Sequence, residues 1–123
     1  MAKVILIVED DPKSLVLIRD LLQLFGYKTI EATDGEKGVE LATAKKPDLI
    51  LMDIMMPKMD GYNACHAIKA DEATRGIPVI MLTAVGYELN EELAKRLGAN
   101  GYITKPFNHQ KLLDVISQFL PTS

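Results

Sequence analysis

The stretch Leu49–Pro57, which reads LILMDIMMP, decides the fold of this chain. Its first four residues are apolar without interruption, a pattern typical of a strand that is buried on both faces of a parallel sheet. The apolar run stops at a carboxylate, Asp53, and Pro57 opens a loop that continues through Asp60 and Gly61. We therefore expect Asp53 to lie at the end of a rigid central strand, beside loop backbone.

The composition is that of one small domain with nearly balanced charge. The 123 residues are 48% hydrophobic, which is enough for one core over residues 1–123. The formal net charge of −3 predicts no surface that attracts nucleic acid or an anionic membrane. A lone cysteine, Cys65, excludes an internal disulfide, and no apolar run suits a signal peptide or a membrane span. We expect a soluble cytoplasmic protein.

Short apolar runs alternate along the chain with longer segments of helical periodicity, which predicts an α/β fold with a parallel sheet covered by helices on both faces. Asp11 before Pro12 is a typical helix start, and Gly26 is a typical helix end. The expected strands cover about residues 3–8, 27–31, 48–52, 78–82 and 101–103. The expected helices cover about residues 12–25, 35–44, 61–69 and 87–97, with a last helix capped by Asn108.

Polar side chains follow four of these strands at the point where each strand ends. They are Glu9 and Asp10, then Asp53, Thr83 and Lys105. Open α/β sheets bind ligands at that edge, and a strand order of 2-1-3-4-5 would bring these side chains together. Three carboxylates in one crevice need a cation, and Mg²⁺ prefers hard oxygen ligands. The lysine and the hydroxyl would supply the donors that a phosphoryl group needs.

These residues, with the motif DIMMPKMDG at 53–61, Thr83-Ala84 and Lys105-Pro106, resemble a response-regulator receiver domain of two-component signalling. The likeness is to the stand-alone type found among chemotaxis and cell-division regulators. It implies a (βα)5 flavodoxin-like, doubly wound parallel sheet in the order 2-1-3-4-5. It also implies that Asp53 accepts a phosphoryl group from a phosphohistidine kinase or a phosphotransfer protein, and that a downstream protein reads the result.

The resemblance also assigns a metal site. It implies that Asp10 and Asp53 bind Mg²⁺ through their carboxylates and Met55 through its backbone carbonyl, with Glu9 acting mainly through water. In the pair after the first strand, Glu9 with Asp10 is preferred because Asp11 suits the helix cap before Pro12. The pair Asp10 and Asp11 stays open as the alternative.

A switch is implied by the same resemblance. Lys105 would pair with the phosphate and Thr83 would move to hydrogen-bond it. Tyr102 would turn inward as Thr83 moves, and the Lys105–Pro106 peptide bond would be cis. The change would be read on the face formed by the fourth helix, the fifth strand and the fifth helix.

Other functions remain as alternatives. A Mg²⁺-dependent phosphohydrolase would usually carry a second aspartate two residues after Asp53, where this chain has Met55. A flavodoxin-like cofactor binder lacks a phosphate loop and paired aromatics here. The chain could also be a receiver fragment of a larger response regulator with an output domain. We expect a signalling protein and no turnover enzyme, as a monomer or a weak dimer.

The first helix carries more apolar residues than one buried stripe requires. One interpretation is a broad core face. The other, suggested by the resemblance, is that Leu15 or Leu22 contributes to a docking patch for the phosphodonor.

Overall fold

The computed structural model describes residues 2–56, 58–83 and 95–120. Its centre is one sheet of five parallel strands in the order β2-β1-β3-β4-β5. The strands are β1 Val4–Val8, β2 Lys28–Ala32, β3 Leu49–Asp53, β4 Val79–Thr83 and β5 Gly101–Thr104. Every residue of β3 and β4 is buried, as the uninterrupted apolar runs predict for strands covered on both faces. The doubly wound fold and its strand order are confirmed.

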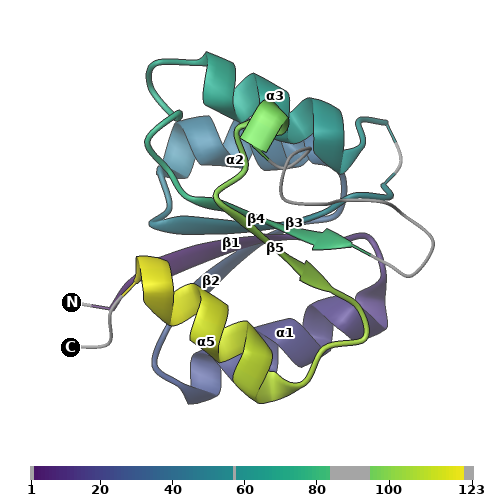
Figure 1. Ribbon diagram of the computed structural model, residues 1–123, viewed down its shortest axis with the longest axis vertical. Coiled ribbons are helices and arrows are strands. Elements are labelled where there is room, and N and C mark those ends of the chain that lie inside the picture. Colours follow the sequence, from purple (N-terminus) through teal and green to yellow (C-terminus); the bar gives the residue numbers. More distant parts are fainter. Residues whose placement is uncertain (1, 57, 84–94, 121–123) are drawn as a thin grey trace.

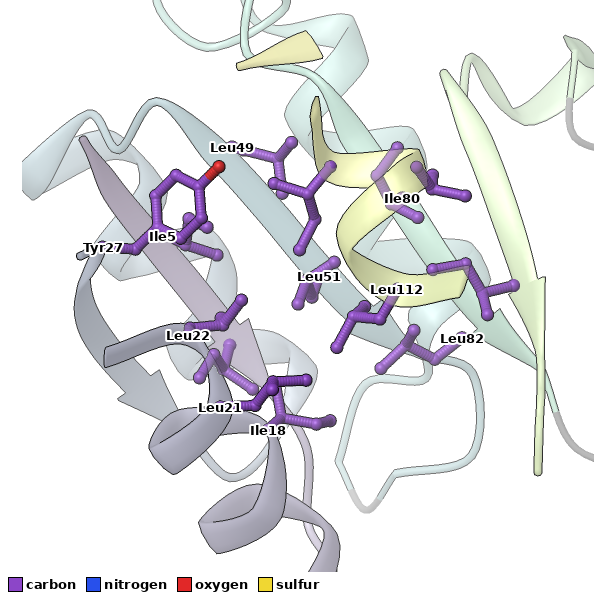
Figure 2. Packing of buried hydrophobic residues seen from close by; sticks show 14 of the residues in the cluster. Ile5, Ile18, Leu21, Leu22, Tyr27, Leu49, Leu51, Ile80, Leu82 and Leu112 are labelled. Carbon is purple, nitrogen blue, oxygen red and sulfur yellow. The ribbon is translucent and has the colours of Figure 1, made fainter. Parts of the chain in front are cut away.

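Helices cover both faces of the sheet: α1 and α5 lie on one face, and α2 and α3 lie on the other (Figure 1). Their bounds are α1 Pro12–Leu24, α2 Gly35–Lys45, α3 Gly61–Ala70 and α5 His109–Phe119. Each face has its own hydrophobic cluster. Figure 2 shows the first, in which Ile18, Leu21 and Leu22 of α1 and Leu112 of α5 pack with side chains of the strands.

An Asn or Asp side chain caps the N-terminus of each of these four helices by accepting a hydrogen bond from a backbone N–H in the first turn. The caps are Asp11, Asp34, Asp60 and Asn108. Parallel strands all end at the same edge of the sheet, which we call the carboxyl edge, and each of these helices follows such an end. The helix N-termini and their caps therefore gather at that edge, while the strands begin at the opposite, amino edge.

Two local expectations were wrong. The central strand is shifted by one residue, because the side chain and backbone of Asp48 bond to Val4 before the ladder starts, whereas Asp53 is itself paired with Leu82. Leu15 and Leu22 cannot form a docking patch, because both are buried in the core. The most exposed apolar side chains of α1 are instead those of Leu17, which is 68% exposed, and Leu24, which is 78% exposed.

The remaining expectations concern the chain around β5. The Lys105–Pro106 peptide bond is cis, as the resemblance implies. Residues 95–97 are helical, but most of the expected fourth helix, together with Ala84, lies outside the described residues. In the ranges that are described, no helix combines the length and the apolar character needed to cross a membrane.

Candidate functional site

The site lies at the carboxyl edge, where the register of the central strands brings distant side chains to one level. Val8 is paired with Met52, and Asp53 is paired with Leu82. Glu9 and Asp10 leave the sheet directly after Val8, so they emerge beside Asp53. A cleft opens there, and its lining includes Glu9, Asp10, Asp53, Met55 and Lys105.

Three of the predicted carboxylates converge in this cleft. Oxygen atoms of Glu9, Asp10 and Asp53 all lie within 4.8 Å of one another. Glu9 is only 1% exposed and Asp53 is also buried, whereas Asp10 is exposed to solvent. A cluster of this kind repels itself at short range, and a cation placed among the three groups would remove the repulsion.

Lys105 faces the carboxylates from the neighbouring loop after β5. Its Nζ lies 3.1 Å from Glu9 Oε2 and 3.6 Å from Asp53 Oδ1. The backbone N–H of Lys105 donates to the Thr83 carbonyl oxygen at 2.6 Å, which ties this loop to the end of β4. One ammonium group therefore faces two buried carboxylates and is held near both by the sheet.

The environment of Glu9 changes its protonation. Burial, reinforced by the nearby charge of Asp53, raises the pKa of Glu9 to about 7, although the ammonium of Lys105 acts in the opposite direction. Burial is the larger of the two causes, because it disfavours the charged form of a carboxyl that has little contact with water.

Asp53 is held in one orientation by its own strand end. The backbone N–H of Ile54 donates to Asp53 Oδ1 at 2.9 Å. The carboxylate stands on the last residue of a strand that is buried along its whole length, so the packing of that strand sets its position.

The structure favours Glu9 over Asp11 as the partner of Asp10. The side chain of Asp11 accepts hydrogen bonds from the backbone N–H and the hydroxyl of Ser14, at 3.3 and 2.8 Å, as the N-cap of α1. The Ser14 hydroxyl lowers the pKa of Asp11. Asp11 lines the cleft, but its carboxylate is engaged in capping, while Glu9 belongs to the converging cluster.

The two residues expected to act as a switch lie further out. Thr83 is the buried last residue of β4 and is paired with Thr104 of β5. Tyr102 lies on β5, is 37% exposed, and lines a separate hollow between β5 and α5 together with Phe119. The structure thus places Thr83 at the end of β4, bonded to Lys105 of the cleft, and Tyr102 on β5, the outermost strand on that side of the sheet.

The donor set fits a small divalent cation. The three converging carboxylates offer hard oxygen atoms, and the exposure of Asp10 leaves room for water on one side, as Mg²⁺ requires. No sulfur or imidazole belongs to the cluster, so the ligand chemistry does not favour softer metals. Met55 lines the same cleft.

Some residues that line the cleft were not singled out from the sequence. Ser14, in the first turn of α1, and Met56, in the loop after Asp53, also line the cleft. The signal for Ser14 was present, because a residue three positions after an N-cap points back toward that cap. No sequence signal distinguishes Met56 from its neighbour Met55.

Comparisons with known proteins agree with this architecture. The family model of the response regulator receiver domain matches residues 5–117. The polar-differentiation response regulator DivK of Brucella ovis is 38% identical over 120 residues, which cover 98% of each chain. The DNA-binding dual master transcriptional regulator RpaA of Synechocystis is 43% identical over 109 residues, which cover 89% of this chain but 45% of RpaA.

A solved structure gives the same result at the level of the fold. The receiver domain of the sensor histidine kinase PA1611 from Pseudomonas aeruginosa superposes with a TM-score of 0.89 at 34% identity. The match covers 99% of this chain and all of the other, and that structure has a magnesium ion coordinated in its active site cleft.

Proposed function

Since this chain belongs to the response regulator receiver domain family, we propose that it works by accepting a phosphoryl group on Asp53 and changing the surface that a partner protein reads. The chain is a receiver domain of two-component phosphorelay signalling. Receiver domains are signalling proteins that interact with histidine kinases and downstream targets, and the alternative of a Mg²⁺-dependent phosphohydrolase is not favoured. The observation that carries the proposal is the convergence of Asp53 with Glu9, Asp10 and Lys105.

The proposed transfer step uses the Asp53 carboxylate as the nucleophile. One of its oxygens attacks the phosphorus of a phosphohistidine, the O–P bond forms as the N–P bond breaks, and the imidazole leaves with the electron pair and takes a proton from water. The hydrogen bond from Ile54 N–H to Oδ1 orients the carboxylate for this attack. Lys105, 3.6 Å from Asp53, supplies an ammonium to the phosphoryl oxygens.

The proposed cofactor is Mg²⁺. Asp10 and Asp53 would bind it through their carboxylates and Met55 through its backbone carbonyl, while Glu9 would act through water. When bound, the ion would supply positive charge to the phosphoryl oxygens as the bond to nitrogen breaks. The convergence of the three carboxylates supports a cation at this place, because like charges at short range repel one another.

The proposed output is a movement of Thr83 and Tyr102. A phosphoryl group on Asp53 adds charge and acceptor oxygens, which would draw Lys105 away from Glu9 and attract the Thr83 hydroxyl. Tyr102 follows on the neighbouring strand and would change the face around β5 and α5. The partners would be a histidine kinase or phosphotransfer protein on one side and a protein target on the other.

Several expectations stay predictions. They are one receiver domain over residues 1–123, the stand-alone arrangement, the monomeric or weakly dimeric state, and slow self-dephosphorylation. A cytoplasmic location is part of the proposal, and it is supported by a single cysteine, Cys65, which is buried and free.

A phosphorylation assay tests the central proposal. The protein is incubated with acetyl phosphate and Mg²⁺, and the added phosphoryl group is located by mass spectrometry. We expect labelling at Asp53 in the wild type, none in Asp53→Asn, and none when the metal is chelated. Asp48→Asn is the matched control, because it makes the same change at the residue just before β3, at the opposite edge of the sheet, and it should be labelled like the wild type. Labelling of Asp53→Asn to the wild-type extent would contradict the proposal.

A further inference from the structure

The N-terminus of α2 is in close contact with the loop that follows Asp53. The backbone N–H of Gly35, the first residue of α2, donates to the Met59 carbonyl oxygen at 3.1 Å. A Cβ at position 35 would overlap that oxygen and would lie 2.9 Å from the Met59 carbonyl carbon. Glycine is therefore required here for close approach of two backbones, and a side chain would push the loop away.

The same loop is held at its other end by α3. The N–H of Gly61 donates to the Ile54 carbonyl oxygen at 2.8 Å. A Cβ on Gly61 would overlap the Asp53 carbonyl oxygen and lie 2.8 Å from Ile54 Cα. Of the described residues between Asp53 and α3, Ile54 thus contacts the N-terminus of α3 and Met59 contacts the N-terminus of α2.

A third contact adds to the α2 anchor. Asp34 caps α2 through Oδ1, and its Oδ2 lies 3.7 Å from Lys58 Nζ. Lys58 is in the left-handed backbone region, with φ of 66°, a conformation that a residue with a side chain adopts only when its surroundings hold it there. The exposed ion pair is weak by itself, so the Gly35–Met59 contact is the main restraint.

Residues of this loop form one wall of the acidic cleft. Ile54, Met55 and Met56 line it next to Asp53. Met55 and Met56 lie four and three residues before Met59, and Ile54 just before them is held by Gly61, so we expect a shift of Met59 to move them as well. Ligands of a small cation tolerate little displacement, because the optimum geometry of Mg²⁺ is narrow.

We propose that Gly35 is a positioning residue of the acidic cleft, and that the N-terminus of α2 holds the loop carrying Met55 in the geometry that binds a divalent cation. The identity of the cation rests on the proposed function. The coupling is reciprocal by thermodynamic necessity: if the anchor favours cation binding, a bound cation stabilises the anchor. A cation bound in the cleft then stabilises the N-terminus of α2, although no residue of α2 is among those that line the cleft.

The test compares two variants of the same helix. Gly35→Ala alters the anchor, whereas Ala42→Gly alters the buried interior of α2 away from the loop and lowers Tm by about 3–6 °C. Amide hydrogen exchange at residues 35 and 61 is measured in the metal-free proteins, and Mg²⁺ affinity is measured by calorimetry. We expect Gly35→Ala to speed exchange at residue 35 and to weaken Mg²⁺ binding, each by about tenfold, and we expect Ala42→Gly to change neither by more than about twofold.

A wild-type measurement completes the test and needs no variant: saturating Mg²⁺ should slow exchange of the Gly35 amide by a factor of several. Wild-type Mg²⁺ affinity in Gly35→Ala, or an equal loss in Ala42→Gly, would overturn the inference. Absence of Mg²⁺ binding in the wild type would instead contradict the proposed function. In that case, the exchange rate at residue 35 in the metal-free proteins still tests whether Gly35 anchors the loop.

Discussion

Two aspartates stand at the two ends of β3 and have opposite surroundings. Asp48, at the amino edge, accepts a hydrogen bond from the Val4 N–H at 2.8 Å and donates its own N–H to the Val4 carbonyl oxygen. Asp53, at the carboxyl edge, shares a cleft with Glu9 and Asp10. The Asp48 carboxylate is bonded to the backbone of β1, whereas the Asp53 carboxylate lies among other negative charges. The difference separates a polar residue that builds the fold from one that is available to a ligand.

The amino edge repeats this arrangement elsewhere. Asn100 accepts from the Val79 N–H through Oδ1 at 2.9 Å and donates its N–H to the Val79 carbonyl oxygen. The Nζ of Lys69 donates to the Ile77 carbonyl oxygen at 2.6 Å. Polar side chains at this edge therefore extend the backbone hydrogen bonding of the sheet.

The largest expected effect concerns the buried thiol of Cys65, in the middle of α3 and outside the acidic cleft. Burial raises the pKa of Cys65 to about 11, so the folded protein at pH 8 holds about a hundredfold less thiolate than a thiol of ordinary pKa. Alkylation by iodoacetamide, followed by mass spectrometry, should be slower by at least that factor in the folded protein than in urea. The folded rate should still rise between pH 9 and 10.5, whereas the rate in urea levels off. A thiol that reacts as fast in the folded protein as in urea would contradict this prediction, and chemically available groups would then not be confined to the carboxyl edge.

The next effect is at the carboxyl edge. Lys105→Ala leaves buried Glu9 without its ion-pair partner, and we expect the free energy of unfolding to fall by about 2 kcal/mol without metal. The double variant Lys105→Ala, Glu9→Gln should recover most of this loss, because the unpaired charge is removed. Urea denaturation of the four members of this cycle gives the coupling. Strict additivity would show that Glu9 and Lys105 do not interact across the cleft.

The smallest effects have opposite signs at the two ends of β3. Asp48→Ala removes the acceptor of the Val4 N–H and should cost about 1 kcal/mol of unfolding free energy. Asp53→Asn keeps an acceptor for the Ile54 N–H but removes a charge beside Glu9 and Asp10, and should add up to about 1 kcal/mol in metal-free buffer. Thermal unfolding in the presence of EDTA measures both changes. The contrast fails if the two substitutions shift Tm in the same direction.

Much of the fold was predictable because the signals were local. The apolar runs of β3 and β4 identified buried strands, and the residues before each helix identified caps that the structure confirms, such as Asp11 and Asn108. The strand boundary at Asp48 and the burial of Leu15 were not predictable in this way. Both depend on a partner that is distant in the sequence, Val4 in one case and the sheet in the other.

The candidate site shows the same division. The residue types and their positions after strands pointed to Glu9, Asp10, Asp53 and Lys105, and the structure brings these four together. The positions of Thr83 and Tyr102 relative to the cleft came only from strand register. The contact between Gly35 and Met59 has no sequence signal, since glycine at a helix start is common and its neighbour belongs to another element.

By itself, then, the sequence determined the order of strands and helices, the helix caps and the identity of the carboxylates at strand ends. Periodicity and capping act within a few residues, so a linear pattern contains them. Tertiary structure alone decided that Asp48, just before β3, bonds to the backbone of β1 and that Asp53 is held beside Glu9 and Asp10. It also decided that α2 touches the loop after Asp53. Hydrogen bonding, burial and charge repulsion depend on distances between residues far apart in the chain, and those distances exist only once the sheet is assembled.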